Sequence, residues 1–309
     1  MRASIPAARD SSHTALRVVA IAVTLTIATP ALAQPRATGW RWSNTAYAQL
    51  DPRALHDEFR VTVRMPLSEE QTPLTGSLAA FVGLGIGGGL RPEVGLELQP
   101  IAPLSLAVAY RPTYYPSFIG AARSYPSPLS EYDSGVFSSP RDGPSGKQSI
   151  FAHQLFLSAS LLWKADWVVG RIAVQASRSW ANLPSGDRVF YDPAYDVVVD
   201  AGGWAAQTDV DLGVQLSPAV IVGLRHTLTI AWYRDAAYAP GESHDNPNTP
   251  ISRIGPAVRW AFFDRATGAE RGSIFLLAQW YVAHRYRTGE AVSGAIPLLG
   301  LGFTLTGGL

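Results

Sequence analysis

The stretch Trp204-Ala-Ala-Gln-Thr-Asp-Val-Asp-Leu-Gly-Val-Gln-Leu216 presents two unlike faces when its residues are taken alternately. One face is apolar and includes Val210, whereas the other carries Asp209 and Asp211. Successive side chains of a β-strand point to opposite sides, so this segment is predicted to be a strand with one dry and one wet face. The same two-residue period recurs in most hydrophobic segments of the chain, which predicts an all-β fold.

The first 33 residues have the pattern of an export signal. Three arginines precede an apolar run over 18–27, and Ala31-Leu-Ala33 places small residues at a cleavage position. The apolar run is shorter than the roughly 20 residues that a membrane helix needs. We expect residues 1–33 to be a cleaved signal peptide, with a retained signal anchor as the alternative, and residues 34–309 to form one domain.

Composition excludes several classes of protein. The chain has 25 basic and 24 acidic residues without a clustered basic face, which argues against a nucleic-acid partner. It has no cysteine, so neither a disulfide framework nor a thiolate metal site is available. Hydrophobic residues make up 47%, yet no apolar run after Ala33 is long enough for a membrane helix. Two classes remain, a secreted soluble β-protein and a closed membrane barrel, in which closure satisfies every backbone polar group.

Strand length separates these two classes, because soluble strands are usually about 5–6 residues long and membrane barrel strands need about 9–11. The alternating segments belong to the longer group, and we predict a closed antiparallel transmembrane β-barrel of about twelve strands. The longest connections fall on one side and both termini on the other, as in bacterial outer-membrane barrels. The predicted strands are 40–50, 58–67, 77–87, 91–99, 103–114, 150–164, 167–181, 204–217, 220–234, 251–264, 273–287 and 295–307.

The segment Leu298-Leu-Gly-Leu-Gly-Phe-Thr-Leu305 resembles the last strand of Gram-negative outer-membrane β-barrel proteins. In that class a glycine is followed by apolar residues three and five positions later, which Gly300, Phe303 and Leu305 match. This chain continues to Leu309, whereas members of the class usually end on an aromatic residue. The resemblance implies a place in the outer membrane of a Gram-negative bacterium, surrounding outer-membrane lipid, and recognition of the C-terminal strand by the barrel assembly machinery. It indicates no particular transporter family.

The charged faces of the predicted strands are expected to line the lumen, because a charge facing lipid costs about 2–4 kcal/mol at mid-bilayer. Asp209 and Asp211 lie between strands that supply Arg171 and Arg225 to the same face. Two interpretations stay open, an ion-pair ladder between neighbouring strands and a pore constriction whose charges set ion selectivity. The candidate lumen or selectivity residues are Arg60, Arg64, Glu93, Glu97, Arg171, Asp209, Asp211, Arg225 and Arg259.

Motifs for other chemistry are incomplete. Gly83-Leu-Gly-Ile-Gly-Gly88 has the spacing of a dinucleotide motif, but no helix pattern follows, so we predict lumen-facing glycines within a strand. His153 and His226 fall on the apolar face, and the pattern places no serine beside them. Glu242, His244 and Asp245 in the loop 235–250 suit either a cation site or a solvated loop. We predict no catalytic residue, no metal and no cofactor.

The inward charges suggest the type of solute. The inward basic residues are Arg60, Arg64, Arg111, Arg171, Arg225, Arg253, Arg259 and Arg285, against Glu93, Glu97, Asp209 and Asp211, which leaves four more positive than negative charges. We expect a porin-like channel for small hydrophilic solutes, with anionic ones favoured if the pore is open.

Two alternatives to a channel remain. The first is a closed structural or surface-interaction barrel that presents the loops 115–149, 182–203 and 235–250, and the second is a barrel-borne hydrolase. The loop 115–149 is also a candidate to fold inward and block the lumen. The charged residues of this loop that would pair with lumen charges are Asp133, Arg141, Asp142 and Lys147.

Overall fold

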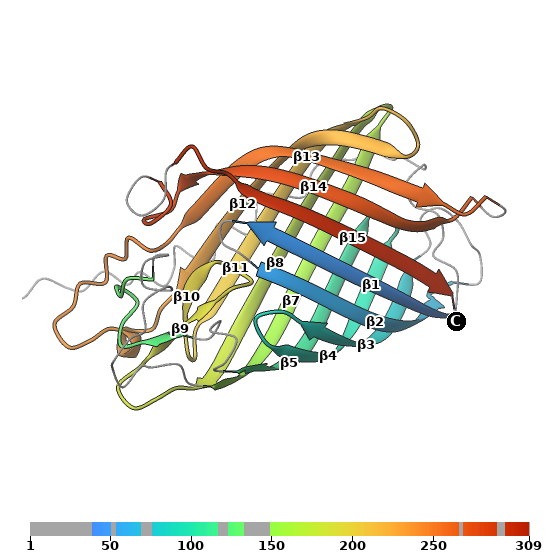
Figure 1. The fold of residues 1–309 in the computed structure, drawn as a ribbon. Coiled ribbons are helices and arrows are strands. Elements are labelled where there is room, and N and C mark those ends of the chain that lie inside the picture. The colour runs from blue at the N-terminus through green and yellow to red at the C-terminus, as the bar shows by residue number, and fades with distance from the viewer. Residues whose placement is uncertain are drawn as a thin grey trace, which may run out of the picture.

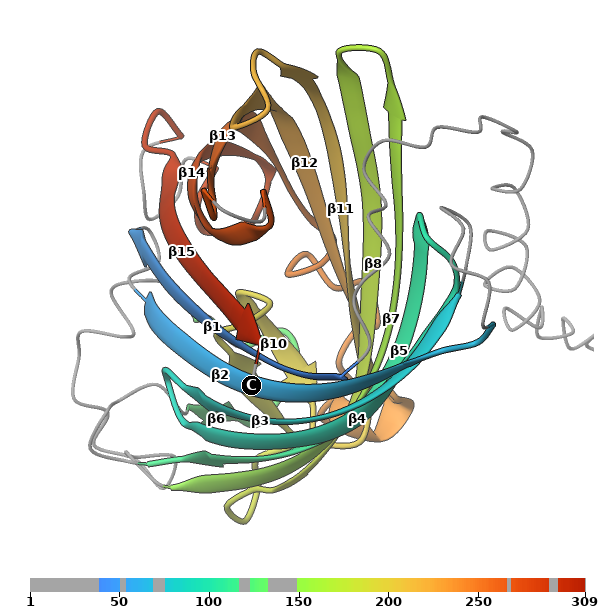
Figure 2. The same cartoon turned by 90° about the vertical axis from the view of Figure 1, so that its right-hand side faces the viewer.

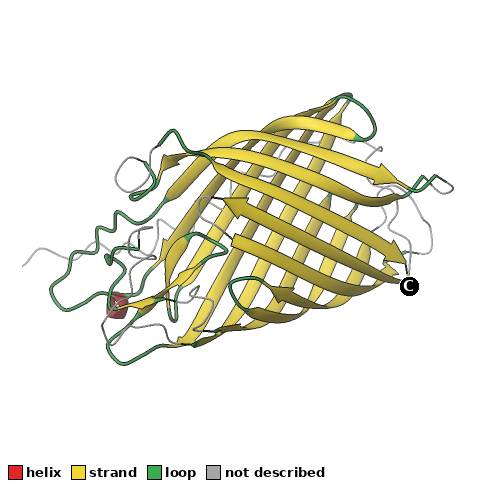
Figure 3. Cartoon of the chain, in the orientation of Figure 1, coloured by secondary structure: helices red, strands yellow, loops and turns green. Residues whose placement is uncertain are grey.

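The computed structural model of the chain describes residues 39–50, 54–68, 76–116, 123–132, 149–265, 268–288 and 294–308. Twelve antiparallel strands close into a barrel (Figure 1; Figure 3). The wall strands are β1 (Gly39–Leu50), β2 (Ala54–Pro66), β3 (Ser77–Ile86), β4 (Leu90–Ile101), β5 (Leu104–Tyr115), β7 (Ile150–Ala165), β8 (Val168–Asn182), β11 (Trp204–Gln215), β12 (Val220–Trp232), β13 (Ile251–Phe263), β14 (Glu270–Ala283) and β15 (Leu298–Gly308). The predicted fold class and all twelve predicted strands are confirmed, whereas the predicted signal peptide lies outside the described residues.

Pairing of β1 with β15 closes the barrel, with Arg41 opposite Gly308. Closure leaves no free strand edge in the wall, so the backbone groups of every strand find partners in its neighbours. Both ends of the described chain therefore lie at one end of the barrel, here called the inner end. The longer connections gather at the opposite, outer end (Figure 1). Among the described residues, no helix is long and apolar enough to cross a membrane.

The wall is apolar on its outer face. Leu212 of β11 is 57% exposed and Leu224 of β12 is 55% exposed, because both point away from the lumen. Asp211, which precedes Leu212 in β11, points inward and forms ion pairs in the lumen. A two-residue period that points apolar side chains outward and charged side chains inward is the arrangement that a membrane barrel requires.

A second, three-stranded sheet lies apart from the wall. It consists of β6 (Ser124–Tyr125), β9 (Val189–Asp192) and β10 (Val197–Asp200), in the order β10-β9-β6. All residues of β9 and β10 are buried. Seen along the barrel, β10 lies within the ring of wall strands (Figure 2). We call residues 189–200, which contain β9, β10 and the turn between them, the plug hairpin.

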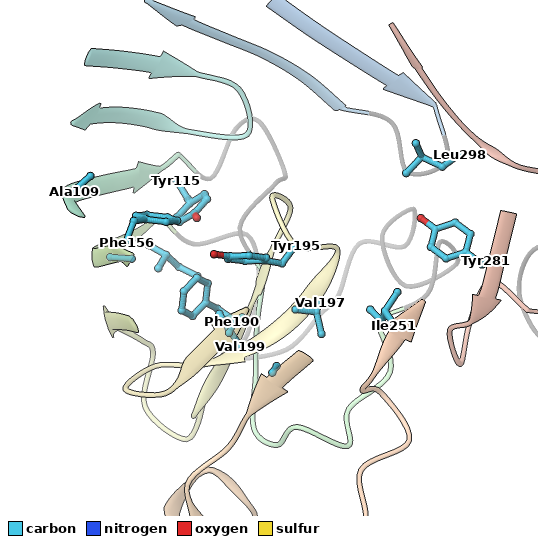
Figure 4. Close-up of a cluster of buried hydrophobic side chains, with 14 of the residues drawn as sticks. Ala109, Tyr115, Phe156, Phe190, Tyr195, Val197, Val199, Ile251, Tyr281 and Leu298 are labelled. Atoms are coloured by element: carbon cyan, nitrogen blue, oxygen red, sulfur yellow. The ribbon is translucent and has the colours of Figure 1, made fainter. Parts of the chain in front are cut away.

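Apolar contacts hold the plug hairpin between opposite parts of the wall. Phe190 and Val197 of the hairpin belong to one buried cluster with Phe156 of β7 and Tyr281 of β14. Figure 4 shows the hairpin side chains between these two sides of the lumen. The connection 182–203, predicted to be an outer loop, therefore fills part of the lumen. Residues 117–122 and 133–148 of the loop 115–149, which was the candidate for this role, lie outside the described chain, and the described part of the loop contributes β6 to the sheet of the hairpin.

The predicted strand 273–287 extends too far at its C-terminal end. β14 ends at Ala283, and the chain then turns over residues 284–288. Tyr286 is buried and packs edge-on against Tyr132 at a centroid distance of 5.0 Å. The apolar and aromatic residues of this turn continue the pattern of the strand, but they bind the segments that cap the barrel instead of the wall.

Candidate functional site

The plug hairpin is held by three carboxylates that are almost fully buried. Asp192 and Asp196 are 2% exposed and Asp200 is 1% exposed. A buried charge is tolerated only where hydrogen bonds or an opposite charge compensate it. Each of these carboxylates accordingly meets a polar side chain from β7, from the segment after β12 or from the segment after β14.

Asp196 is the centre of the largest of these networks. Its Oδ1 accepts a hydrogen bond from the Tyr191 hydroxyl, and its Oδ2 accepts one from the Tyr281 hydroxyl, both at 2.8 Å. Arg287 Nε lies 3.2 Å from Oδ2, and His284 Nε2 lies 3.7 Å from the same atom. Burial raises the pKa of Asp196, but Arg287, His284 and Tyr191 outweigh burial and hold that pKa below its ordinary value. The carboxylate is therefore charged at neutral pH.

The other two carboxylates fix the hairpin elsewhere along its length. Asp192 Oδ2 accepts a hydrogen bond from Gln154 Nε2 at 3.0 Å, and burial raises the pKa of Asp192 above its ordinary value. Asp200 accepts two hydrogen bonds from the Arg234 guanidinium, each at 2.7 Å. Burial raises the pKa of Asp200, but the hydrogen bonds from Arg234 outweigh it and leave the pKa below its ordinary value. The hairpin is thus attached to its surroundings at three polar points.

Four of the predicted lumen residues form ion pairs on the wall built by β2 to β4. Arg60 Nη2 donates to Glu93 Oε1 at 2.8 Å, and Arg64 Nη2 donates to Glu97 Oε1 at 3.0 Å. Glu93 also accepts a hydrogen bond from Arg111 Nε of β5 at 2.7 Å. The Arg111–Glu93 pair joins neighbouring strands, as expected of an ion-pair ladder. The Arg60–Glu93 and Arg64–Glu97 pairs instead reach from β2 to β4 across β3, where Gly83 and Ala79 occupy the positions between the paired residues.

The other five predicted residues lie on β8, β11, β12 and β13. Asp211 of β11 lies opposite Arg171 of β8 on one side and opposite Arg225 of β12 on the other. Arg225 binds Asp211 with two hydrogen bonds of 2.6 and 2.9 Å, and Arg171 Nη1 lies 3.3 Å from Asp211 Oδ2. Asp209 accepts a hydrogen bond from Thr227 Oγ1 at 2.7 Å. A forked arginine–carboxylate contact is a strong, directional pair, so this group also cross-links strands.

A polar cavity of about 520 Å³ occupies the lumen beside the hairpin turn. Ala194 of that turn lines it together with side chains of β1, β8 and β11 to β15. The lining arginines are Arg171, Arg225, Arg253 and Arg259, and the one lining carboxylate is that of Asp209. Arg259 also lines a second cavity of about 600 Å³ formed by the inner-end connections. The described lumen is therefore filled by the hairpin on one side of this cavity and hollow toward the inner end.

The nine predicted residues thus fall into two groups, and four members of the second group line the cavity, namely Arg171, Asp209, Arg225 and Arg259. Sequence reasoning missed the carboxylates of the plug hairpin. A signal for the hairpin exists, because Val189-Phe-Tyr191 and Val197-Val-Val199 flank the turn-forming Asp192-Pro-Ala-Tyr-Asp196. Gly83 and Gly85 are confirmed as strand residues of β3, whereas Gly87 and Gly88 lie in the turn that follows its end at Ile86.

A hydrogen-bonded serine–histidine pair lies on the outer face of the wall. His226 Nε2 of β12 is 2.9 Å from Ser252 Oγ of β13. The expectation that no serine lies beside His226 is wrong, because antiparallel pairing sets Ser252 opposite Leu228, diagonally across from the histidine. Within the described chain, Nδ1 of His226 has no hydrogen-bond partner to orient the ring as a catalytic triad does.

Two polar side chains of the loop 235–250, those of Glu242 and His244, are held in protein contacts. Glu242 accepts hydrogen bonds from the Ser127 hydroxyl and, at 2.8 Å, from the Ala239 amide. His244 stacks on Tyr238 with a centroid distance of 4.4 Å. Over the ranges that the structure describes, no group of three or more His, Cys, Asp or Glu side chains is placed to hold a metal ion.

Twelve antiparallel strands in a closed barrel, apolar outside and charged inside, define a transmembrane β-barrel of the bacterial outer-membrane class. The class predicted from the sequence is confirmed.

No protein-family model matches the chain, and no curated protein matches it. Among solved structures it is similar to an outer membrane channel from Pseudomonas putida F1, with 11% identity, coverage of 91% of this chain and 100% of that one, and a TM-score of 0.42. It is also similar to the NanC porin, with 8% identity, coverage of 87% of this chain and 100% of that one, and a TM-score of 0.38. The β-domain of a Bordetella autotransporter has 10% identity, coverage of 87% of this chain and 99% of that one, and a TM-score of 0.39. Similarity of this size carries no information about solutes or partners.

Proposed function

We propose that the protein is an outer-membrane channel for small hydrophilic solutes, with a preference for anionic ones, and that the plug hairpin covers its outer mouth. The observation that carries this proposal is the polar cavity of about 520 Å³ beside the hairpin turn. An eight-stranded barrel is just filled by its own side chains, whereas a wider one encloses free space. Four lining arginines against one lining carboxylate support the anionic preference.

The remaining expectations from the sequence complete this proposal. Residues 1–33 direct export and are then removed. Outer-membrane lipid solvates the apolar outer face, and β15 is the strand that the barrel assembly machinery contacts.

Single-channel recording on refolded protein tests the channel. The wild type is compared with a variant in which residues 189–200 are replaced by a short Gly-Ser linker. This change leaves every wall strand intact, so we expect a several-fold larger conductance in the variant. Circular dichroism establishes that both proteins fold as β-structure. Absence of conductance above background in both folded proteins would contradict the channel.

The first alternative is a closed structural or surface-interaction barrel. The burial of the hairpin and its three carboxylates favours this reading. It differs from the channel in its expected result, because hairpin removal would then leave the bilayer insulating. In this case the surface available to partners comes from the loops 115–149 and 235–250 more than from 182–203.

The second alternative is a hydrolase on the barrel exterior, which the His226–Ser252 hydrogen bond of 2.9 Å favours. Lipase and protease assays on the refolded wild type decide it, with His226→Ala as the control. Ester or peptide hydrolysis that disappears in His226→Ala would favour the enzyme. Equal background rates in the two proteins would exclude this pair as its site.

A further inference from the structure

Arg253 of β13 differs from the other arginines that line the cavity, because it has no counter-ion among the residues that the structure describes. Six of the eight inward arginines that the sequence identifies form ion pairs with carboxylates, namely Arg60, Arg64, Arg111, Arg171, Arg225 and Arg259. Within the described residues, Arg253 forms no ion pair, and its buried Nε has no hydrogen-bond partner. A guanidinium left in this state at a cavity wall is available to an anion, which it prefers to bind in a forked geometry.

The hairpin carboxylate that interacts electrostatically with Arg253 does not neutralise this arginine. Asp196 lies within the electrostatic reach of Arg253. However, Asp196 already has Arg287 as its ion-pair partner and the hydroxyls of Tyr191 and Tyr281 as hydrogen-bond donors. The positive charge of Arg253 is therefore free to meet an anion that enters from the cavity.

A second unsatisfied polar atom lines the same cavity. Gln279 of β14 is 1% exposed, and its Nε2 donates to the Arg225 carbonyl at 3.2 Å and to Thr227 Oγ1 at 3.1 Å. These bonds fix the orientation of the amide. Its Oε1 is buried and, in the part of the chain that the structure describes, accepts no hydrogen bond. A buried acceptor of this kind costs about 1–3 kcal/mol unless a donor reaches it.

The two atoms lie on adjacent strands, because Arg253 of β13 pairs with Tyr281, two residues along β14 from Gln279. One supplies positive charge and the other needs a neutral donor such as a hydroxyl. We propose that Arg253 and Gln279 form a binding subsite for a hydroxylated organic acid. Its carboxylate accepts hydrogen bonds from Arg253, and one of its hydroxyls donates to Gln279 Oε1. The cavity of about 520 Å³ matches small-molecule sites of roughly 300–1,000 Å³, which suits a sugar acid. The subsite deepens the proposed channel function and rests on it for the route of entry.

Isothermal titration calorimetry on the full folded chain in detergent tests the subsite with three probes. Glucuronate carries both chemical groups, glucose lacks the charge, and sulfate lacks the hydroxyls. We expect the wild type to bind glucuronate more tightly than either other probe. Arg253→Gln is expected to weaken glucuronate binding at least about tenfold, since a hydrogen bond to a charged group contributes that much or more. Gln279→Met retains the arginine and is expected to weaken glucuronate binding but not sulfate binding.

Arg271→Gln is the matched control, because Arg271 lies on β14 like Gln279 but is paired with Asp264 and lines neither cavity. Its affinity for glucuronate is expected to stay within about twofold of the wild type. Equal affinity of the wild type and both test variants overturns the subsite, as does equal wild-type affinity for glucuronate and sulfate. Should Arg253→Gln fail to fold, Gln279→Met decides alone. Conductance is recorded on the same preparations. Conductance without glucuronate binding overturns the subsite alone, and binding without conductance overturns the channel alone.

Discussion

Replacing Asp196 by alanine should release the plug hairpin while leaving the barrel wall folded. The substitution removes the carboxylate that pairs with Arg287 and accepts hydrogen bonds from two tyrosine hydroxyls. Removing one member of a buried ion pair costs about 3–5 kcal/mol. The ratio of docked to released hairpin is therefore expected to fall about 10²- to 10⁴-fold, since every 1.4 kcal/mol is a factor of ten. The twelve wall strands do not include Asp196, so their ladders stay intact.

Hydrogen exchange read by mass spectrometry on peptides that cover residues 189–200 measures this release, because local opening sets the exchange rate. We expect rapid exchange there, unchanged protection in β11 and β12, and a several-fold larger time-averaged conductance. The control Asp235→Asn removes an outer-loop carboxylate that is 94% exposed, and it should change neither readout. Wild-type protection of the hairpin in Asp196→Ala would refute the reasoning, because the carboxylate would then contribute nothing to docking.

Three further predictions concern pH, the ion-pair ladder and strand packing. The pKa values of Asp196 and Asp200 lie below their ordinary values, so their contribution to docking is present above the unfolded value of about 3.9 and is lost as pH falls through the folded pKa. Conductance should therefore rise in strong acid as the hairpin is released. The raised pKa of Asp192 opposes part of this change, because protonation of Asp192 favours the docked hairpin. A conductance that does not change with pH would count against the carboxylate network of the hairpin. Asp211→Asn should lower the free energy of unfolding in urea by about 1–3 kcal/mol, and Asp209→Asn should lower it by about 0.5–1.5 kcal/mol. Equal losses in the two variants would contradict the ion-pair ladder. A changed ion selectivity would indicate a pore constriction. Gly255→Ala should fail to refold, because the added methyl group would collide with the Ala278 carbonyl oxygen. Gly302→Ala is the control and should refold, because the atom nearest to its added methyl group is 3.4 Å away. A folded Gly255→Ala barrel on gel electrophoresis would exclude this close approach at Gly255.

The wall of the barrel is predictable from the sequence because each strand carries its own orientation. On β11, Leu212 faces outward and Asp211 faces inward. Reversing the strand would expose the carboxylate to lipid, at a cost below that of an arginine or lysine at mid-bilayer, which is about 2–4 kcal/mol. A period of two and a length near twelve residues therefore define a strand without knowledge of its neighbours. Even the contact of Asp211 with Arg171 and Arg225 follows once the strands pair in order.

The plug hairpin is not predictable in this way, because its environment is created by other parts of the chain. Val197-Val-Val199 is buried on both faces and shows no alternation that distinguishes lumen from surface. Its position depends on Asp196 meeting Tyr281 and Arg287, which lie far away in sequence. Local patterns predict a turn between two apolar runs, but whether the runs enter the lumen depends on these long-range contacts.

The net charge of the lumen is likewise not predictable from the sequence, because it depends on which charged side chains pair. The sequence predicts four more positive than negative inward charges, but the structure adds Glu58 beside Arg60, Glu270 beside Arg259 and the carboxylates of the hairpin. Once these are paired, the sum of charges no longer indicates where an anion binds. Within the described part of the chain, the lack of a counter-ion at Arg253 becomes visible only after each pairing distance is known. Under the proposed function, preference among solutes therefore depends on one guanidinium and one amide oxygen, so replacing a paired arginine should change stability more than it changes solute binding.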